Sequence, residues 1–131
     1  MSQKNVDAFL EHVEAVNRAD VPGALRFMDP EIQFETQVSA LQGTYTGHDG
    51  ARTFFTDIVG HFAVFQVHFS DVRDLGDRVL ALGTARTIGK GSGIEQETSL
   101  AIVMMFREGL ITQFKDYGDK AEALEAAGLR E

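Results

Sequence analysis

Cysteine is absent from this 131-residue chain, and positive charge is scarce. Without cysteine there is no disulfide framework, no thiol nucleophile and no cysteine-based zinc site, which suits a reducing cytoplasm. Only 12 Lys and Arg stand against 20 Asp and Glu, so the net charge is -8. Because phosphate groups need a positive surface, this charge opposes binding to nucleic acid or to an anionic membrane. We therefore expect neither as a partner.

Long apolar runs are also missing from the start of the sequence. The segment "MSQKNVDAFLEHVEAV" has a helical period with acidic residues interspersed. A signal peptide would instead show a basic segment followed by an unbroken apolar run. We expect no signal peptide, no membrane span and a cytoplasmic location. The apolar fraction of 44% suits one domain over residues 1–131 with a single core.

The apolar residues that are present recur with periods that predict four helices and five strands. Helices are expected at 6–16, 21–28, 51–62 and 120–127, and strands at 31–37, 63–75, 78–88, 95–106 and 110–117. The glycine-rich segment 39–50 is expected to be a loop. Four of the strands follow one another without crossover helices, so they cannot build a parallel sheet. The predicted class is α+β, with a curled sheet whose concave side is covered by helices and encloses a conical pocket.

Two strands predict that the outer face of the sheet is covered as well. The segments "VLALG" and "SLAIVMMF" are apolar at successive positions, and therefore on both faces of the sheet. A large apolar patch facing water marks an interaction surface. The simplest cover is a second copy, which predicts a homodimer through the outer sheet face.

Three segments carry a resemblance to a known family: "GTYTGHDGARTFF", "LGDRVLALG" and "REGLITQFKDYGDKAEALEAAGL". Together with the order of elements, they resemble the nuclear-transport-factor-2-like superfamily and its SnoaL-like branch. The last segment is similar to the limonene epoxide hydrolase family. The resemblance implies a cone-shaped α+β roll of the cystatin type, with mixed or antiparallel strands and an internal pocket. It also carries the catalytic Asp of that motif onto Asp116.

The hairpin around "REG" predicts which way Asp116 faces. If this is a three-residue loop with Gly109 in the left-handed conformation, Phe106 pairs with Leu110, and Leu100 lies opposite Asp116. Cross-strand partners share a face of the sheet. The predicted inward face therefore also contains Thr98, Ile102, Met104, Thr112 and Phe114. It is mostly apolar, as the wall of a ligand cavity would be.

Other residues of the related enzymes carry over less completely. The positions that match the water-positioning Tyr and Asn of the epoxide hydrolase family are Phe34 and Thr36, which cannot do the same work, and the base of the ketosteroid isomerase family also falls at Thr36. The third strand offers Arg86 without a second Asp, so the triad of the epoxide hydrolases is incomplete. Arg86 or His68 could stabilise developing charge beside Asp116. Period-two alternation leaves open whether His68 faces the pocket or the solvent.

The predicted function is acid–base chemistry, without a cofactor, on a small hydrophobic organic molecule. Burial in an apolar cavity would disfavour the charged form of Asp116, whereas an adjacent Arg would keep it ionised. The expected substrate contacts are Phe34, Thr36, Leu100, Ile102, Met104, Phe114, Phe55 and Val59. A hydrolase, cyclase or isomerase of the SnoaL-like kind is the leading hypothesis. A ligand carrier and a dimerisation module are the alternatives.

Two further interpretations bear on single residues. Asp116 could have a structural role and order the end of its strand and the terminal helix. The four histidines show neither a His-x-x-x-His pair nor a carboxylate triad at ligand spacing, so no metal site is expected.

Overall fold

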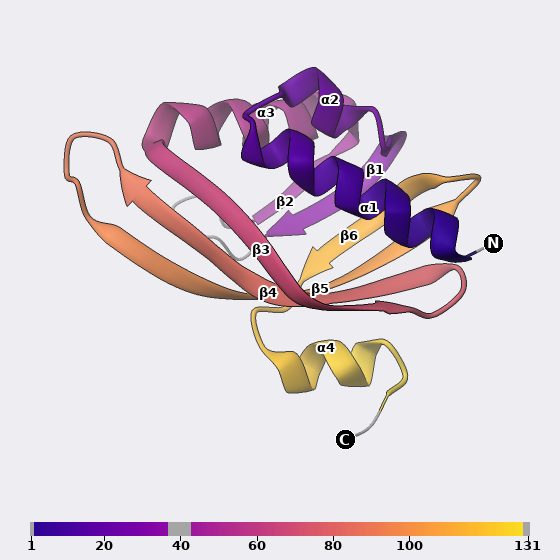
Figure 1. Ribbon diagram of the computed structural model, residues 1–131. Coiled ribbons are helices and arrows are strands. Elements are labelled where there is room, and N and C mark those ends of the chain that lie inside the picture. Colours follow the sequence, from indigo (N-terminus) through magenta and orange to yellow (C-terminus); the bar gives the residue numbers. More distant parts are fainter. Residues whose placement is uncertain (1, 37–42, 130–131) are drawn as a thin grey trace.

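A curled sheet of six strands forms the centre of the molecule in the computed structural model, which describes residues 2–36 and 43–129 (Figure 1). The strands are β1 (Met28–Thr36), β2 (Gly43–Thr46), β3 (Phe62–Asp74), β4 (Arg78–Gly89), β5 (Glu95–Arg107) and β6 (Leu110–Asp116). The helices are α1 (Ser2–Asn17), α2 (Val21–Leu25), α3 (Gly47–His61) and α4 (Lys120–Ala126). Their spatial order in the sheet is β2-β1-β6-β5-β4-β3. The pair β1 and β6 is parallel, and the other pairs are antiparallel.

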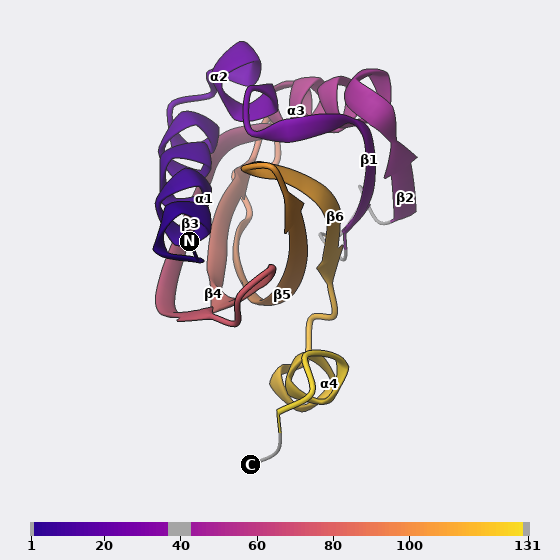
Figure 2. The same ribbon diagram turned by 90° about the vertical axis from the view of Figure 1, so that its right-hand side faces the viewer.

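Helices α1, α2 and α3 cover the concave side of the sheet (Figures 1 and 2). Their apolar faces are buried, as the period of three and four residues predicts; Phe9 of α1 and Ala51 of α3 are almost fully inaccessible. Asp20 caps α2, because its Oδ1 accepts the N–H of Gly23 at 3.0 Å. The predicted α+β class with helices on the concave side is confirmed. None of the described helices is long and apolar enough to cross a membrane.

The hairpin between β5 and β6 differs from the predicted three-residue loop. Arg107 pairs with Leu110, and both residues between them have positive φ, at 53° for Glu108 and 80° for Gly109. This two-residue turn shifts the predicted register by one residue. A bulge next to Phe106 shifts it by one more, so Asp116 lies opposite Ile102 instead of Leu100. A shift of two residues keeps the same face inward, since side chains alternate along a strand.

Helix α4 lies on the other side of the sheet from the three N-terminal helices (Figures 1 and 2). It packs against the apolar patch that motivates the predicted dimer; this cluster contains Leu80, Leu82, Ala101, Val103, Ala123, Leu124 and Ala127. The Asp119 side chain caps α4 at the N–H of Glu122, and Gly128 ends it with φ 81°. The chain therefore covers this patch itself, and a second copy is not needed for that purpose. The homodimer stays a prediction.

The two edges of the sheet are finished in different ways. The edge strand β2 occupies part of the segment predicted to be a loop, and residues 39–42 of that segment lie outside the described residues. At the other edge, the side chain of Asn17 pairs with the backbone of Val67 in β3: its Nδ2 donates to the carbonyl oxygen at 3.0 Å, and its Oδ1 accepts the N–H at 2.8 Å. The side-chain amide of Asn17 thus takes the place of a neighbouring strand and satisfies the backbone N–H and carbonyl groups of Val67.

Candidate functional site

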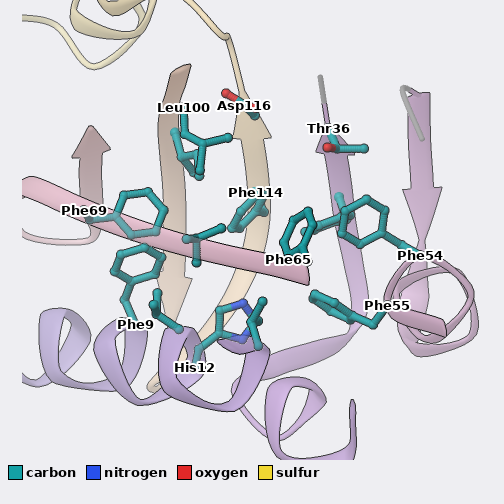
Figure 3. Close-up of a pocket in the computed structure, with 15 residues that line it drawn as sticks. Phe9, His12, Thr36, Phe54, Phe55, Phe65, Phe69, Leu100, Phe114 and Asp116 are labelled. Atoms are coloured by element: carbon teal, nitrogen blue, oxygen red, sulfur yellow. The ribbon is translucent and has the colours of Figure 1, made fainter. Parts of the chain in front are cut away.

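A cavity walled largely by aromatic rings lies between the concave face of the sheet and helices α1 and α3 (Figure 3). Its lining consists of Phe9, His12, Val13, Val16, Phe34, Thr36, Phe54, Phe55, Phe65, Val67, Phe69, Leu100, Ile102, Phe114 and Asp116. Within this described lining, only His12, Thr36 and Asp116 carry polar side chains. The cavity is about 50 Å³ in volume. By volume it therefore holds a few water molecules, at roughly 10–15 Å³ each.

Parallel pairing of β1 with β6 builds the aromatic wall. Phe34 and Phe114 are register partners on these strands, and their ring centroids are 4.6 Å apart. Phe54 of α3 packs on Phe34 with a centroid distance of 4.7 Å. Tilted and edge-on ring contacts of this kind add to the energy of burial. The wall presents an apolar, aromatic surface to anything that enters the cavity.

Asp116 lies at one end of this cavity, at the end of β6, and is only 2% exposed. Its Oδ1 accepts the backbone N–H groups of Ala101 at 3.1 Å and Gly118 at 2.9 Å. These bonds hold the end of β6 to β5 and order the chain leading to α4. Hydrogen bonds from two N–H groups also stabilise a buried carboxylate. Asp116 thus has the structural role that the sequence left open, and it also lies at the cavity, as the catalytic hypothesis requires.

His12 projects from α1 into the same cavity and is only 3% exposed (Figure 3). Its Nδ1 is 2.9 Å from the carbonyl oxygen of Ala24 in α2. Because a carbonyl oxygen can only accept, Nδ1 carries the proton in this bond. Burial lowers the pKa of His12 to about 4, although the hydrogen bond to Ala24 raises it in part. At neutral pH the imidazole is therefore uncharged.

Most of the predicted contact residues do line the cavity: Phe34, Thr36, Phe55, Leu100, Ile102 and Phe114. Met104 is fully buried in the main core but is not part of the lining. The backbone of Val59 belongs to α3, and its side chain lies outside the described part of the structure.

The structure contradicts the expectation that Arg86 converges on Asp116. Arg86 is exposed, and its Nε lies 2.7 Å from Oε2 of Glu95 on the outer side of the sheet. Its neighbours Ala85 and Thr87 are the buried residues of this part of β4. Side chains alternate between the two faces of a strand, so Arg86 points away from the cavity.

His68 also lies on the outer face, which settles the alternative that the sequence left open. In β3 the odd-numbered Phe65, Val67 and Phe69 line the cavity, and His68 is exposed. His68 instead borders a shallow depression next to the start of α4. Among the described residues, no group of three or more His, Asp or Glu side chains is arranged to hold a metal ion.

A second, larger hollow of about 360 Å³ adjoins the aromatic cavity. It is an open groove between the C-terminal ends of α1 and α3, α2 and the beginning of β3, with Asn17, Arg18, Gln66 and Lys90 among its polar residues. Three residues line both spaces: Val16, Phe55 and Phe65. These side chains form the partition between the groove and the aromatic cavity, so small movements of them would join the two.

A curled sheet closed by helices around an apolar cavity defines a class of small α+β proteins with an internal pocket. This chain belongs to the SnoaL-like domain family, whose model matches residues 7–114. The family is part of the NTF2-like superfamily, in agreement with the resemblance seen in the sequence. No curated protein sequence matches the chain significantly.

Solved structures with the same fold support this assignment. An NTF2-like protein of unknown function from Burkholderia pseudomallei is 27% identical, with a TM-score of 0.80, and the match covers 93% of this chain and 95% of that one. TerC, crystallised with polyporic acid, is 22% identical with a TM-score of 0.77, and the match covers 95% and 98% of the two chains. A protein with a ketosteroid isomerase-like fold from Catenulispora acidiphila, in complex with trimethylamine, is 16% identical with a TM-score of 0.77 over 94% and 93%.

Proposed function

We propose that this protein binds a small, largely apolar organic molecule in the aromatic cavity and that Asp116 performs acid–base chemistry on it without a cofactor. The observation that carries the proposal is a buried carboxyl group at the end of an apolar cavity whose lining includes seven phenylalanine residues. Exclusion of water strengthens the interaction of such a carboxylate with a reacting proton. An apolar wall with a few polar groups is also the usual composition of a small-molecule site.

The size of the cavity bears on how a ligand is accommodated. Ligand sites commonly measure roughly 300–1,000 Å³, whereas the aromatic cavity is about 50 Å³ and the adjoining groove about 360 Å³. An organic ligand therefore has to displace part of the partition formed by Val16, Phe55 and Phe65. Phe65 is half-buried and sits on an edge strand, so it has room to turn toward the groove.

Turnover after removal of the Asp116 charge tests the proposal. Asp116→Asn keeps an oxygen that can accept from Ala101 and Gly118 but removes the carboxylate. The reaction would be followed by mass spectrometry, as deuterium or oxygen-18 incorporated from labelled water into a panel of small cyclic ketones and epoxides. For a compound that the wild type converts, we expect the variant to be slower by about 10²–10⁴-fold, the usual contribution of a general acid or base. Glu35→Gln is the control, because Glu35 pairs with Lys115 outside the cavity.

The outcome separates the three hypotheses. Equal rates in the wild type and Asp116→Asn would show that Asp116 is not the catalytic group. Binding of panel compounds without any incorporation would indicate a carrier, an alternative favoured by the outward positions of Arg86 and His68. A protein that neither binds nor converts any compound would fit a dimerisation module.

A further inference from the structure

The geometry of His12 narrows the class of molecule that the aromatic cavity takes. This inference rests on the proposed function of the cavity as a ligand site. His12 is only 3% exposed and is part of the cavity lining. Its ring contacts three aromatic residues of the same lining, Phe9, Phe55 and Phe114. It is therefore a polar group within an apolar wall, where a mismatch in hydrogen bonding is costly.

The hydrogen bond to Ala24 determines what the other ring nitrogen offers. Since Nδ1 donates to the Ala24 carbonyl oxygen, Nε2 of the neutral imidazole has a lone pair and no proton. Ala24 lines the outer groove and not the aromatic cavity. The two nitrogens lie on different edges of the ring, so Nε2 is turned away from Ala24, and Figure 3 shows the ring projecting from α1 toward Phe65 and Phe114. The cavity thus contains a hydrogen-bond acceptor whose identity is fixed by the fold.

We propose that His12 Nε2 accepts a hydrogen bond from a hydroxyl group of the ligand, and that the cavity therefore selects uncharged aromatic molecules that carry a hydroxyl, with phenol as the simplest member. A ligand without a donor would bury this nitrogen unpaired and lose the corresponding free energy. An anionic ligand is disfavoured, because it would face the Nε2 lone pair and would lose its hydration in an apolar cavity. His12 is here a specificity-determining residue of the binding step.

Comparison of phenol with toluene tests this role, because the two differ only by a hydroxyl in place of a methyl group. Dissociation constants of both would be measured by NMR titration for the wild type and for His12→Phe, which keeps an aromatic ring and removes the acceptor. We expect phenol to lose about tenfold in affinity relative to toluene in His12→Phe, the loss that one unpaired buried hydrogen-bonding group gives. The control is His61→Phe at the exposed end of α3, outside the cavity, which should leave the ratio unchanged.

A second measurement uses the unmodified protein, so the test does not depend on the folding of His12→Phe. The nitrogen-15 shift of His12 Nε2 should begin at the value of an unprotonated nitrogen and move on addition of phenol, but much less on addition of toluene. An Nε2 signal that responds equally to both, or an unchanged affinity ratio in His12→Phe, overturns the role of His12 and leaves the cavity as a binding site. If neither compound perturbs the cavity residues, this inference is overturned, while the proposed function is decided separately by the labelled-water experiment with Asp116→Asn.

Discussion

The imidazole of His12 couples folding to pH, because it is buried in its neutral form. Its pKa is lowered from 6.5 to about 4 in the folded protein, chiefly by desolvation. As the pH falls below 6.5, the unfolded chain therefore binds a proton at this position while the folded chain does not. The folded state loses stability across this window, from about pH 6.5 down to pH 4, and has its full stability above it.

We expect this loss to amount to about 3 kcal/mol in the free energy of unfolding, at 1.36 kcal/mol for each pKa unit. His12→Phe should lack it, so that its stability falls less between neutral pH and about pH 4 than that of the wild type. Urea denaturation at a series of pH values would measure the difference, with His61→Phe as the matched control. Parallel pH curves for the wild type and His12→Phe would contradict the prediction.

Among single residues, some members of the candidate site can be predicted from the sequence and others cannot. Asp116 stands out because a carboxylate interrupts an apolar strand face. His12 carries no such signal: it lies three residues after Phe9 and four before Val16, so it continues the apolar face of a helix and looks like a core residue. Its spacing does indicate that it faces inward. Its hydrogen bond to Ala24 depends on how α2 packs against α1, which one sequence does not reveal.

The short helix α4 covers the apolar patch on the outer face of the sheet, where the predicted homodimer would form. Leu124 is 5% exposed and belongs to the cluster with Leu80, Leu82 and Val103. Leu124→Asp should weaken the docking of α4, because it removes a buried apolar side chain and adds a charge in its place. We expect a loss of about 3 kcal/mol in the free energy of unfolding, an increase in the binding of an apolar dye, and more self-association.

Ala126→Asp is the matched control, since it adds the same charge at an exposed position of the same helix. Light scattering and denaturation would be measured for both variants. If Leu124→Asp behaves like Ala126→Asp, then α4 does not protect the sheet. Phenol and toluene affinities should change little in either variant, because the aromatic cavity is on the opposite side of the sheet.

The helices and the long strands could be predicted from the sequence, whereas a short strand and the orientation of two strands could not. Apolar periodicity recovers the four helices and the long strands, but the helix expected at 21–28 ends at Leu25, and Met28 already begins β1. The capping residues Asp20 and Asp119 mark helix starts in the sequence as well as in the structure. Strand β2 is missed because it has only four residues and lies in a segment rich in Gly, Thr and Ser, a composition that predicts a loop. The faces of β3 and β4 remained ambiguous because a strand with period two has two equivalent orientations until its neighbours are known. For this reason the sequence left the orientation of His68 open and offered Arg86 as a partner of Asp116.

For the molecule as a whole, the partition between the groove and the aromatic cavity should control how fast a ligand enters. Phe65→Ala removes part of this partition and joins the two spaces. We expect phenol to associate faster, ligands larger than phenol to be admitted, and stability to fall by about 2 kcal/mol, since Phe65 is only half-buried. Exchange NMR would measure the rates of association and dissociation.

Phe62→Ala is the control, because Phe62 is also half-buried on β3 but lines the groove alone. It should lower stability to a similar extent without changing the association rate. Equal rates for Phe65→Ala and the wild type would mean that the ligand enters by another path.

The parallel pairing of β1 with β6 also has a consequence for the order in which the chain can fold. Strand β1 spans residues 28–36, but its sheet neighbour β6 spans residues 110–116, so 73 residues, more than half of the sequence, lie between them. Contacts between such distant segments carry a large loop-closure cost and tend to slow folding. During synthesis the helices and the hairpins of β3, β4 and β5 can form early, while β1 has to wait. The cavity, with Phe34 on one strand and Asp116 on the other, is therefore among the last features of the molecule to exist.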